Sequence, residues 1–170
     1  MAILLAFGLS LASSAALARE QAQGVKAVQL GAFKDWKVYV HETPKGKICF
    51  VLAEPKDTQP KNVKRDAMRL SVTARPAEGV RNEVSVVGGY TYKPNSNVIV
   101  QAGNDSFRLF TKNDGAWLSQ AAEDSRLVEV MRKNPSVLVK GTSQRGTLTT
   151  DTYSLAGFAT AIDRLNQECK

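Results

Sequence analysis

The chain has few of the side chains on which enzymes and metalloproteins most often depend. Its 170 residues include one histidine, His41, and two cysteines, Cys49 and Cys169, which lie far apart in the sequence. A hydrolase triad would need His41 as its base, but a lone histidine at a loop edge is more often an ordinary surface residue. The sequence has no nucleophile elbow, zinc-binding His-Glu-x-x-His helix or phosphate-binding glycine loop. We therefore expect no catalytic residues, no metal site and no cofactor, which argues against an enzyme.

Long hydrophobic runs are also missing, and the most apolar stretch is the segment 1–18. It has no charged side chain, contains three serines and ends in Ala16-Leu17-Ala18. A short apolar segment that ends in such a triplet is typical of a secretory signal, here cleaved after Ala18. A membrane anchor fits less well, because a spanning helix needs roughly 20 apolar residues. No Lys or Arg precedes the apolar run, which a start codon assigned slightly too late would explain.

The signal predicts export to the periplasm, the cell surface or the medium. Residues 19–32 would then form a flexible polar leader and residues 33–170 a single domain, long enough to bury a hydrophobic core. An oxidising compartment favours a disulfide between Cys49 and Cys169, which would stabilise the fold by about 4–5 kcal/mol in the chain-entropy model. Two buried free thiols are the alternative.

Acidic residues are fewer than basic ones, 16 against 23, and the net charge is +7. Basic residues gather between positions 45 and 75, where four form a candidate partner-binding patch: Lys56, Lys61, Lys64 and Arg65. For an exported protein the accessible anions are lipopolysaccharide, phospholipid headgroups and acidic glycans rather than nucleic acid. A solvated basic surface that aids solubility is the alternative interpretation.

Alternation of apolar and polar residues dominates from Phe33 onward and predicts short β-strands. It is clearest over 68–74, whereas 48–53 is apolar on both faces, as in a central strand. Hairpins are predicted at Gly103-Asn104-Asp105 and Asn113-Asp114-Gly115, and the proline-containing stretch 54–66 is predicted to be a loop. This pattern favours a mainly β protein, a sandwich or a barrel.

Two segments depart from this alternation. Residues 121–133 contain good helix formers, and Glu123-Asp124 falls in the first turn, where negative charge offsets the helix dipole. Ser154 can cap a second helix whose apolar residues recur at spacings of three and four: Leu155, Phe158, Ile162, Leu165 and Cys169. That spacing puts Cys169 on the buried face, where it can meet the strand that holds Cys49.

The aromatic residues give weaker signals. Trp36 and Trp117 lie in strand-like surroundings, and we expect them in the core rather than in a ligand platform. Tyr90, Tyr92 and Lys93 follow Gly88-Gly89 and form an aromatic and basic edge. That edge fits either a partner surface or tyrosines packed at a glycine bend.

Several motifs together resemble one family of exported bacterial proteins. They are F-K-D-W at 33–36, K-I-C-F at 47–50, the stretch 75–85, and the pattern G-T…R-G-T…D-x-Y-S-L-x-G-F…C from 141 to 169. These motifs span nearly the whole mature chain and resemble the invasion-associated locus B family. The resemblance implies an envelope or secreted protein with an immunoglobulin-like antiparallel β-sandwich and a closing C-terminal helix. With the helix at 121–133, the expected fold has one internal and one C-terminal helix.

The same resemblance bears on chemistry. The family has no established catalytic residues, and its members are associated with the entry of intracellular bacteria into host cells. Related sequences often carry a cysteine where this chain has Tyr39. That alternative pairing is absent here, which leaves Cys49–Cys169 as the one possible intramolecular bridge.

Three functions follow as hypotheses. The leading one is a non-enzymatic envelope or secreted protein that binds an envelope or host component through its basic surface. The second is a periplasmic chaperone that pairs client strands with an open sheet edge. The third, an enzyme acting on envelope glycans or lipids, has the least support, because no carboxylate constellation is visible in the sequence.

Overall fold

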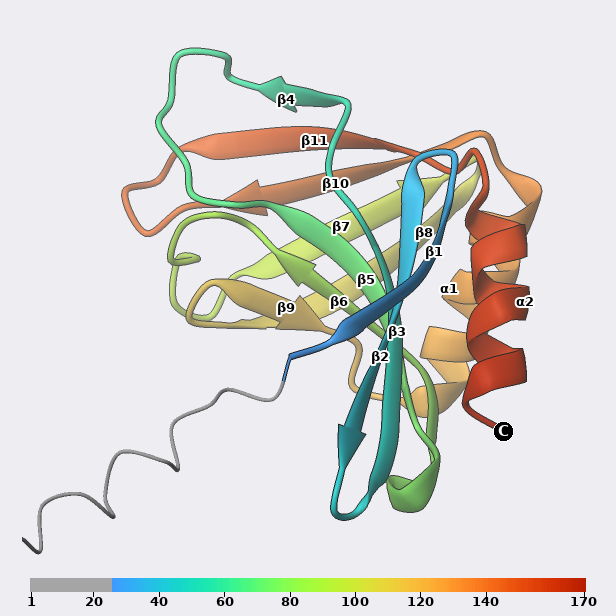
Figure 1. The fold of residues 1–170 in the computed structure, drawn as a ribbon. Coiled ribbons are helices and arrows are strands. Elements are labelled where there is room, and N and C mark those ends of the chain that lie inside the picture. The colour runs from blue at the N-terminus through green and yellow to red at the C-terminus, as the bar shows by residue number, and fades with distance from the viewer. Residues whose placement is uncertain (1–25) are drawn as a thin grey trace, which may run out of the picture.

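The structure is a computed structural model, and it describes residues 26–170 (Figure 1). The predicted signal segment 1–18 lies outside the described residues. The strands are β1 Val28–Phe33, β2 Trp36–Thr43, β3 Gly46–Ala53, β4 Asp57–Gln59, β5 Arg69–Arg75, β6 Val80–Val87, β7 Asn97–Ala102, β8 Asp105–Lys112, β9 Gly115–Trp117, β10 Ser136–Thr142 and β11 Leu148–Ser154. The helices are the 3₁₀ helix η1 Pro76–Glu78 and the α-helices α1 Ala121–Lys133 and α2 Phe158–Glu168.

The strands described form one antiparallel sheet in the order β1-β2-β3-β5-β6-β9-β8-β7-β10-β11-β4. The strands β1 to β3 run across the direction of β7, β10 and β11, so the sheet curls into two layers (Figure 1). Both α-helices lie together at one side of these layers (Figure 1). The predicted mainly β, antiparallel sandwich with one internal and one C-terminal helix is confirmed.

The core lies between the layers and under the helices, and it follows from the alternation in the strands. In β5, for example, Leu70, Val72 and Ala74 are buried while the residues between them point outward. Helix α2 adds Phe158, whose ring meets that of the fully buried Trp36 at 4.7 Å. Each such side chain contributes about 1.5–3 kcal/mol when it is fully buried.

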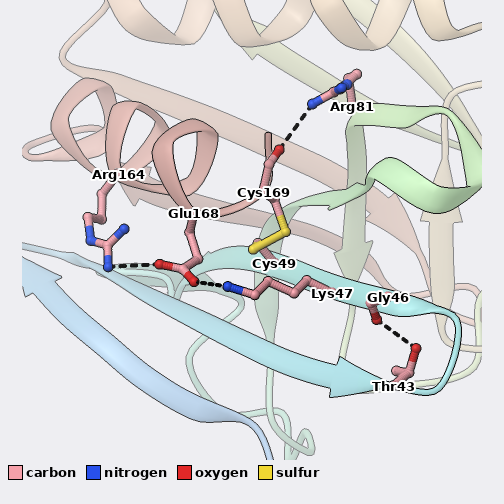
Figure 2. The surroundings of a disulfide bond; sticks show 8 residues. All are labelled: Thr43, Gly46, Lys47, Cys49, Arg81, Arg164, Glu168 and Cys169. Carbon is pink, nitrogen blue, oxygen red and sulfur yellow. Dashed lines mark hydrogen bonds and ion pairs between the residues drawn. A yellow bond between two sulfur atoms is a disulfide. The ribbon is translucent and has the colours of Figure 1, made fainter.

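The disulfide between Cys49 and Cys169 is present, and the free-thiol alternative is wrong (Figure 2). The two Cα atoms are 6.0 Å apart, and both cysteines are buried. The bond ties the end of α2 to the central strand β3. Lys47 and Glu168 form an ion pair beside it, and Arg81 donates to the Cys169 carbonyl oxygen at 3.0 Å (Figure 2).

Two strands lie where none was predicted. Strand β1 occupies 28–33, so the predicted leader 19–32 is wrong over 28–32, and the sheet begins earlier than position 33. Its pairing with β2 shifts register after Gln29, and Val28 is 60% exposed, so the edge strand lacks a clean alternation. Strand β4 lies inside the predicted loop 54–66 and pairs only with β11. The sequence pattern of each strand is too weak to predict it, because β1 and β4 are held in the sheet by pairing with β2 and β11.

Helix α2 starts later than predicted, and Ser154 is not its cap. Ser154 is the last residue of β11, where it pairs with Ser136, and its hydroxyl accepts a hydrogen bond from the Ala156 N–H at 3.2 Å. The residue before the helix is Gly157, in the left-handed conformation at φ 86°. A Cβ at Gly157 would lie 2.0 Å from the Phe33 carbonyl oxygen, so close packing as well as conformation requires glycine here.

Candidate functional site

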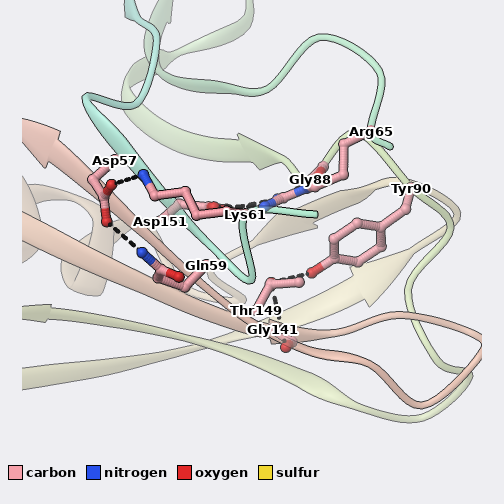
Figure 3. Close-up of polar contacts among 9 residues, drawn as sticks. All are labelled: Asp57, Gln59, Lys61, Arg65, Gly88, Tyr90, Gly141, Thr149 and Asp151. Carbon is pink, nitrogen blue, oxygen red and sulfur yellow. Dashed lines mark hydrogen bonds and ion pairs between the residues drawn. The ribbon is translucent and has the colours of Figure 1, made fainter. Parts of the chain in front are cut away.

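A buried ion pair closes one end of the sandwich. Arg65 donates two hydrogen bonds to the Asp151 carboxylate, at 2.6 and 2.7 Å, and two more to the Gly88 carbonyl oxygen (Figure 3). The side chains of Arg65 and Asp151 are 5% and 3% exposed. Burial opposes the charged guanidinium, but the hydrogen bonds to Asp151 outweigh it and raise the pKa of Arg65. Arg65 therefore stays charged, and its hydrogen bonds hold the loop before β5 against β11.

Tyrosines pack beside this pair. The guanidinium of Arg65 lies 4.9 Å from the centre of the Tyr90 ring, and the Tyr90 hydroxyl is 2.6 Å from the Thr149 hydroxyl (Figure 3). Burial raises the pKa of Tyr90, so its phenol stays protonated at neutral pH. A Cβ at Gly141 would lie within 3 Å of both Tyr90 and Tyr92, which explains the glycine at that position. These contacts make a rigid floor.

A cleft of about 350 Å³ opens above this floor, and we call it the end cleft. Its walls are the loop 63–66, the turn 89–91 and the hairpin 143–147 that joins β10 to β11. Lys64 and Arg145 are exposed on these walls, and neither forms an ion pair within residues 26–170. Asp66 is the one carboxylate of the lining, and Arg65 is the third cation.

The hairpin that carries Arg145 is held by its own hydrogen bonds. The Ser143 N–H donates to the Thr147 carbonyl oxygen at 2.9 Å, and the Thr147 N–H donates to the Ser143 hydroxyl at 3.1 Å. Gly146 supplies the left-handed turn at φ 85°. Arg145 is thus displayed from a short, fixed turn rather than from a long loop.

The four residues of the predicted basic patch do not form one exposed surface. Lys56 pairs with Asp35, Lys61 pairs with Asp57, and Arg65 is buried on Asp151. Asp35 and Asp151 come from other parts of the chain, and Asp57 lies four residues before Lys61, so a count of nearby basic residues overstated the free charge. The structure brings Lys64 and Arg65 together at the end cleft and adds Arg145, which was not predicted as a site residue.

The other residues singled out in the sequence lie elsewhere. His41 lies inside β2, opposite Ile48, rather than after the strand, and its Nδ1 is buried with no hydrogen-bond partner in the described part of the chain. Trp36 is in the core as predicted, whereas Trp117 is only half-buried and pairs with the exposed Phe110. Tyr92 is buried and Lys93 is exposed.

Asp124 has a role that its helix position did not reveal. Its carboxylate accepts a hydrogen bond from the Val84 N–H at 2.8 Å, just where the short strand β9 stops pairing with β6. Burial raises its pKa to about 6. The carboxylate thus satisfies a strand N–H that the sheet leaves unpaired, in addition to lying in the first turn of α1.

The end cleft has the groups that bind an anion. Lys64, Arg145 and several hydroxyls line it together with one carboxylate, Asp66, and the nearby buried carboxylate of Asp151 is held by Arg65. Within residues 26–170 there is no group of three or more His, Cys, Asp and Glu side chains able to hold a metal ion. Guanidinium and ammonium groups beside hydroxyl donors suit phosphate or carboxylate ligands.

A family model described as Invasion associated locus B (IalB) protein matches residues 36–166. The chain belongs to the IalB family. The resemblance seen in the motifs is confirmed. The fold is also similar to that of a crystal structure of invasion associated protein B from Bartonella henselae, with a TM-score of 0.60 and 14% identity. That match covers 82% of this chain and 96% of the Bartonella chain.

Two further findings concern this IalB-family chain. No protein with a curated description matches it. Within residues 26–170, no helix has the length and apolar character needed to cross a membrane.

Most residues of the C-terminal IalB-like pattern have structural roles. Asp151 holds Arg65, Gly157 allows the close approach to Phe33, and Cys169 forms the disulfide. The R-G-T part is different, because Arg145 and Thr147 line the end cleft. This part of the pattern is the signal that would have pointed to the cleft.

Proposed function

We propose that this IalB-family protein is exported and acts without catalysis, by binding an anionic group of the bacterial envelope or of a host surface in the end cleft. The observation that carries the proposal is the placement of Lys64 and Arg145 in the lining of one cleft. Neither cation forms an ion pair with a residue of the described chain, so an external anion does not compete with an internal carboxylate for them.

The rigid floor supports this proposal. Separation of Arg65 from Asp151 would leave two buried charges unpaired. Arg65 therefore contributes a positive potential and a fixed side-chain position to the end cleft rather than a mobile contact. Tyr90 and Thr149 offer hydroxyls already oriented by each other. A preorganised site loses less free energy on binding than one that must order its side chains.

Binding without turnover also fits the groups that are present. General acid–base catalysis needs a group that gains and loses a proton near the working pH. In the end cleft Arg65 is locked in its ion pair and the pKa of Tyr90 is raised by burial, so the lining offers the single carboxylate of Asp66 with no second carboxylate or histidine to act with it. We therefore place the function in recognition, as expected for an adhesion or envelope-binding factor.

Export is supported by the segment 1–18 and by the disulfide. The segment has the composition of a cleaved signal, and the buried Cys49–Cys169 bond is of the kind that persists in oxidising compartments. Cell fractionation of the producing bacterium tests this part. Recovery of a chain shortened by the signal in the periplasm or medium is expected, and an uncleaved chain in the cytoplasm would contradict it.

The chaperone alternative has weaker support. Client strands need a long, regular edge, and in the described residues the edges of the sheet are β1 and β4. Strand β1 has a register shift after Gln29, and β4 has three residues. Both features obstruct the addition of another strand.

The binding test uses the purified mature protein and two double variants of equal charge change. Lys64→Glu/Arg145→Glu reverses both free cations of the end cleft, and Lys112→Glu/Lys140→Glu reverses two exposed lysines of β8 and β10. Each protein is sedimented with phosphatidylcholine vesicles, with vesicles that also contain phosphatidylglycerol, and with lipopolysaccharide, and each is applied to heparin. These ligands separate phospholipid, lipopolysaccharide and acidic glycan as sources of the anion.

The cleft variant is expected to lose about tenfold or more in affinity for the preferred anionic ligand, and the control variant much less. Equal losses in both variants would mean that net charge alone drives binding. Unchanged binding in the cleft variant would overturn the assignment of the end cleft.

A further inference from the structure

A second cleft lies on the outer face of the sheet, away from the ion pair of the end cleft. It has a volume of about 510 Å³ and lies where β6, β8 and β9 approach the start of α1. These elements adjoin one another in Figure 1. We call it the aromatic cleft, because Trp117 and Phe110 line it.

The two aromatic residues form one platform. Trp117 and Phe110 are register partners on β9 and β8, with ring centres 6.0 Å apart, and Phe110 is 47% exposed. A Cβ at Gly115 would lie 2.2 Å from the indole, so the indole lies along the strand over that glycine. The half-buried indole therefore presents a ring surface to the cleft instead of standing away from the sheet.

The charged residues that line the aromatic cleft are one cation, Arg81, and two carboxylates, Glu83 and Asp124. Both carboxylate oxygens of Glu83 accept hydrogen bonds from Arg75. Arg81 donates to the carbonyl oxygen of Cys169, and Asp124 accepts from the Val84 N–H. Arg81 forms no ion pair within residues 26–170, but it shares the lining with two carboxylates, so charge of one sign does not dominate the cleft.

Uncharged polar side chains also line the aromatic cleft. Asn82 donates its amide N–H to the Ser125 hydroxyl at 3.2 Å, which leaves its side-chain carbonyl oxygen available to a ligand. Gln120 is exposed and, although it precedes α1, its side chain does not cap that helix. The amides of Asn82 and Gln120 thus offer both donors and acceptors beside an apolar ring surface.

We infer that the aromatic cleft binds a neutral oligosaccharide. A pyranose ring has an apolar face of C–H groups and a rim of hydroxyls, so it can stack on the Trp117–Phe110 platform while its hydroxyls bond to Asn82 and Gln120. This ligand uses both halves of the cleft, and it needs neither a free charge nor the end cleft. The inference stands independently of the anion-binding proposal.

The test titrates the mature protein with two soluble sugars, the tetramer of N-acetylglucosamine and cellotetraose. Binding is followed by tryptophan fluorescence and by saturation-transfer NMR. The chain has two tryptophans, and Trp36 is fully buried, so a change in emission on binding reports Trp117. Phe110→Ala and Gln120→Ala remove exposed cleft groups, and Leu148→Ala, which removes an exposed apolar residue of β11, is the matched control. Thermal melts confirm that each variant is folded.

We expect saturable binding of at least one sugar, weakened about fivefold or more by Phe110→Ala and by Gln120→Ala and unchanged by Leu148→Ala. Three results would overturn the inference: no saturable signal with either sugar, binding that both cleft variants leave intact, or equal weakening by the control. A proline-rich peptide that binds in place of the sugars would reassign the cleft to peptide recognition.

Discussion

At the scale of single residues, the pair of Arg65 and Asp151 has the largest consequence for the end cleft. The two side chains are almost fully buried, and their hydrogen bonds join segments 86 residues apart in the sequence. Removal of one partner leaves the other charged and unpaired in the interior. Such a loss is far more costly than the loss of an exposed ion pair.

We therefore expect Asp151→Ala to lower the free energy of unfolding by about 3–5 kcal/mol, as measured by urea denaturation. Asp57→Ala, which removes the partner of Lys61 in an exposed ion pair of the edge strand β4, is the control and is expected to have little measurable effect. If the two variants had equal stability, the ion pair would not be the anchor of the cleft floor.

The buried carboxylate of Asp124 is expected to make the stability of the fold depend on pH. Burial raises its pKa from 3.8 to about 6, so the native state binds a proton more readily than the unfolded state. The charged carboxylate therefore opposes folding above pH 6, and this penalty, on the order of 3 kcal/mol, disappears as the pH falls toward 4.

Asp124→Asn keeps the acceptor for the Val84 N–H and removes the charge, so it is expected to be more stable than the unmodified protein at pH 7.5 and equal to it near pH 4. Urea unfolding of both proteins across this pH range measures the difference. Asp124→Ala, which leaves the Val84 N–H unpaired, is expected to be less stable than Asp124→Asn at every pH. A stability difference between Asp124→Asn and the unmodified protein that did not change with pH would contradict the assignment.

At the scale of elements, the junction between β11 and α2 depends on Gly157. Replacement of Gly157 by alanine would destabilise the fold in two ways. The left-handed conformation disfavours a side chain, and the new Cβ would lie 2.0 Å from the Phe33 carbonyl oxygen. Gly79 has a similar conformation, at φ 71°, but nothing lies within 4 Å of the position of its Cβ. A comparison of alanine substitutions at the two glycines therefore distinguishes the effect of conformational strain from the effect of steric crowding.

Gly79→Ala is expected to cost about 1 kcal/mol, and Gly157→Ala several kcal/mol, because the backbone at Phe33 must also move. Denaturant unfolding of both variants checks this order. Equal losses would show that the β11–α2 junction adjusts freely and that the contact with β1 is not limiting.

At the scale of the whole molecule, local patterns predicted the elements but not the contacts between them. The alternation over β5, the hairpin turn at Gly103 and the helix 121–133 were correct because neighbouring residues determine them. The Cys49–Cys169 bond was also predicted, because the chain has two cysteines and an expected oxidising compartment, and the helical spacing put Cys169 on the buried face.

The contacts that build the site were missed because they join distant parts of the chain. Asp151, which pairs with Arg65 and buries it, lies 86 residues away in the sequence. Asp124, which accepts a hydrogen bond from the Val84 N–H, lies 40 residues from Val84. Arg145 enters the end cleft only because β10 and β11 bring their hairpin beside the loop 63–66. Charge density along the sequence therefore did not show which cations have internal partners and which do not.

The most direct test of the central claim, that the end cleft binds an anionic group, is an amide NMR titration of the ¹⁵N-labelled mature protein. The ligand is short-chain phosphatidylglycerol below its micelle concentration, and short-chain phosphatidylcholine is the uncharged comparison. Anion binding in the end cleft predicts saturable shifts for the loop 63–66, the turn 89–91 and the hairpin 143–147 with the anionic lipid, and much smaller shifts with the uncharged lipid. Shifts that are absent, or that fall outside these three segments, would contradict it.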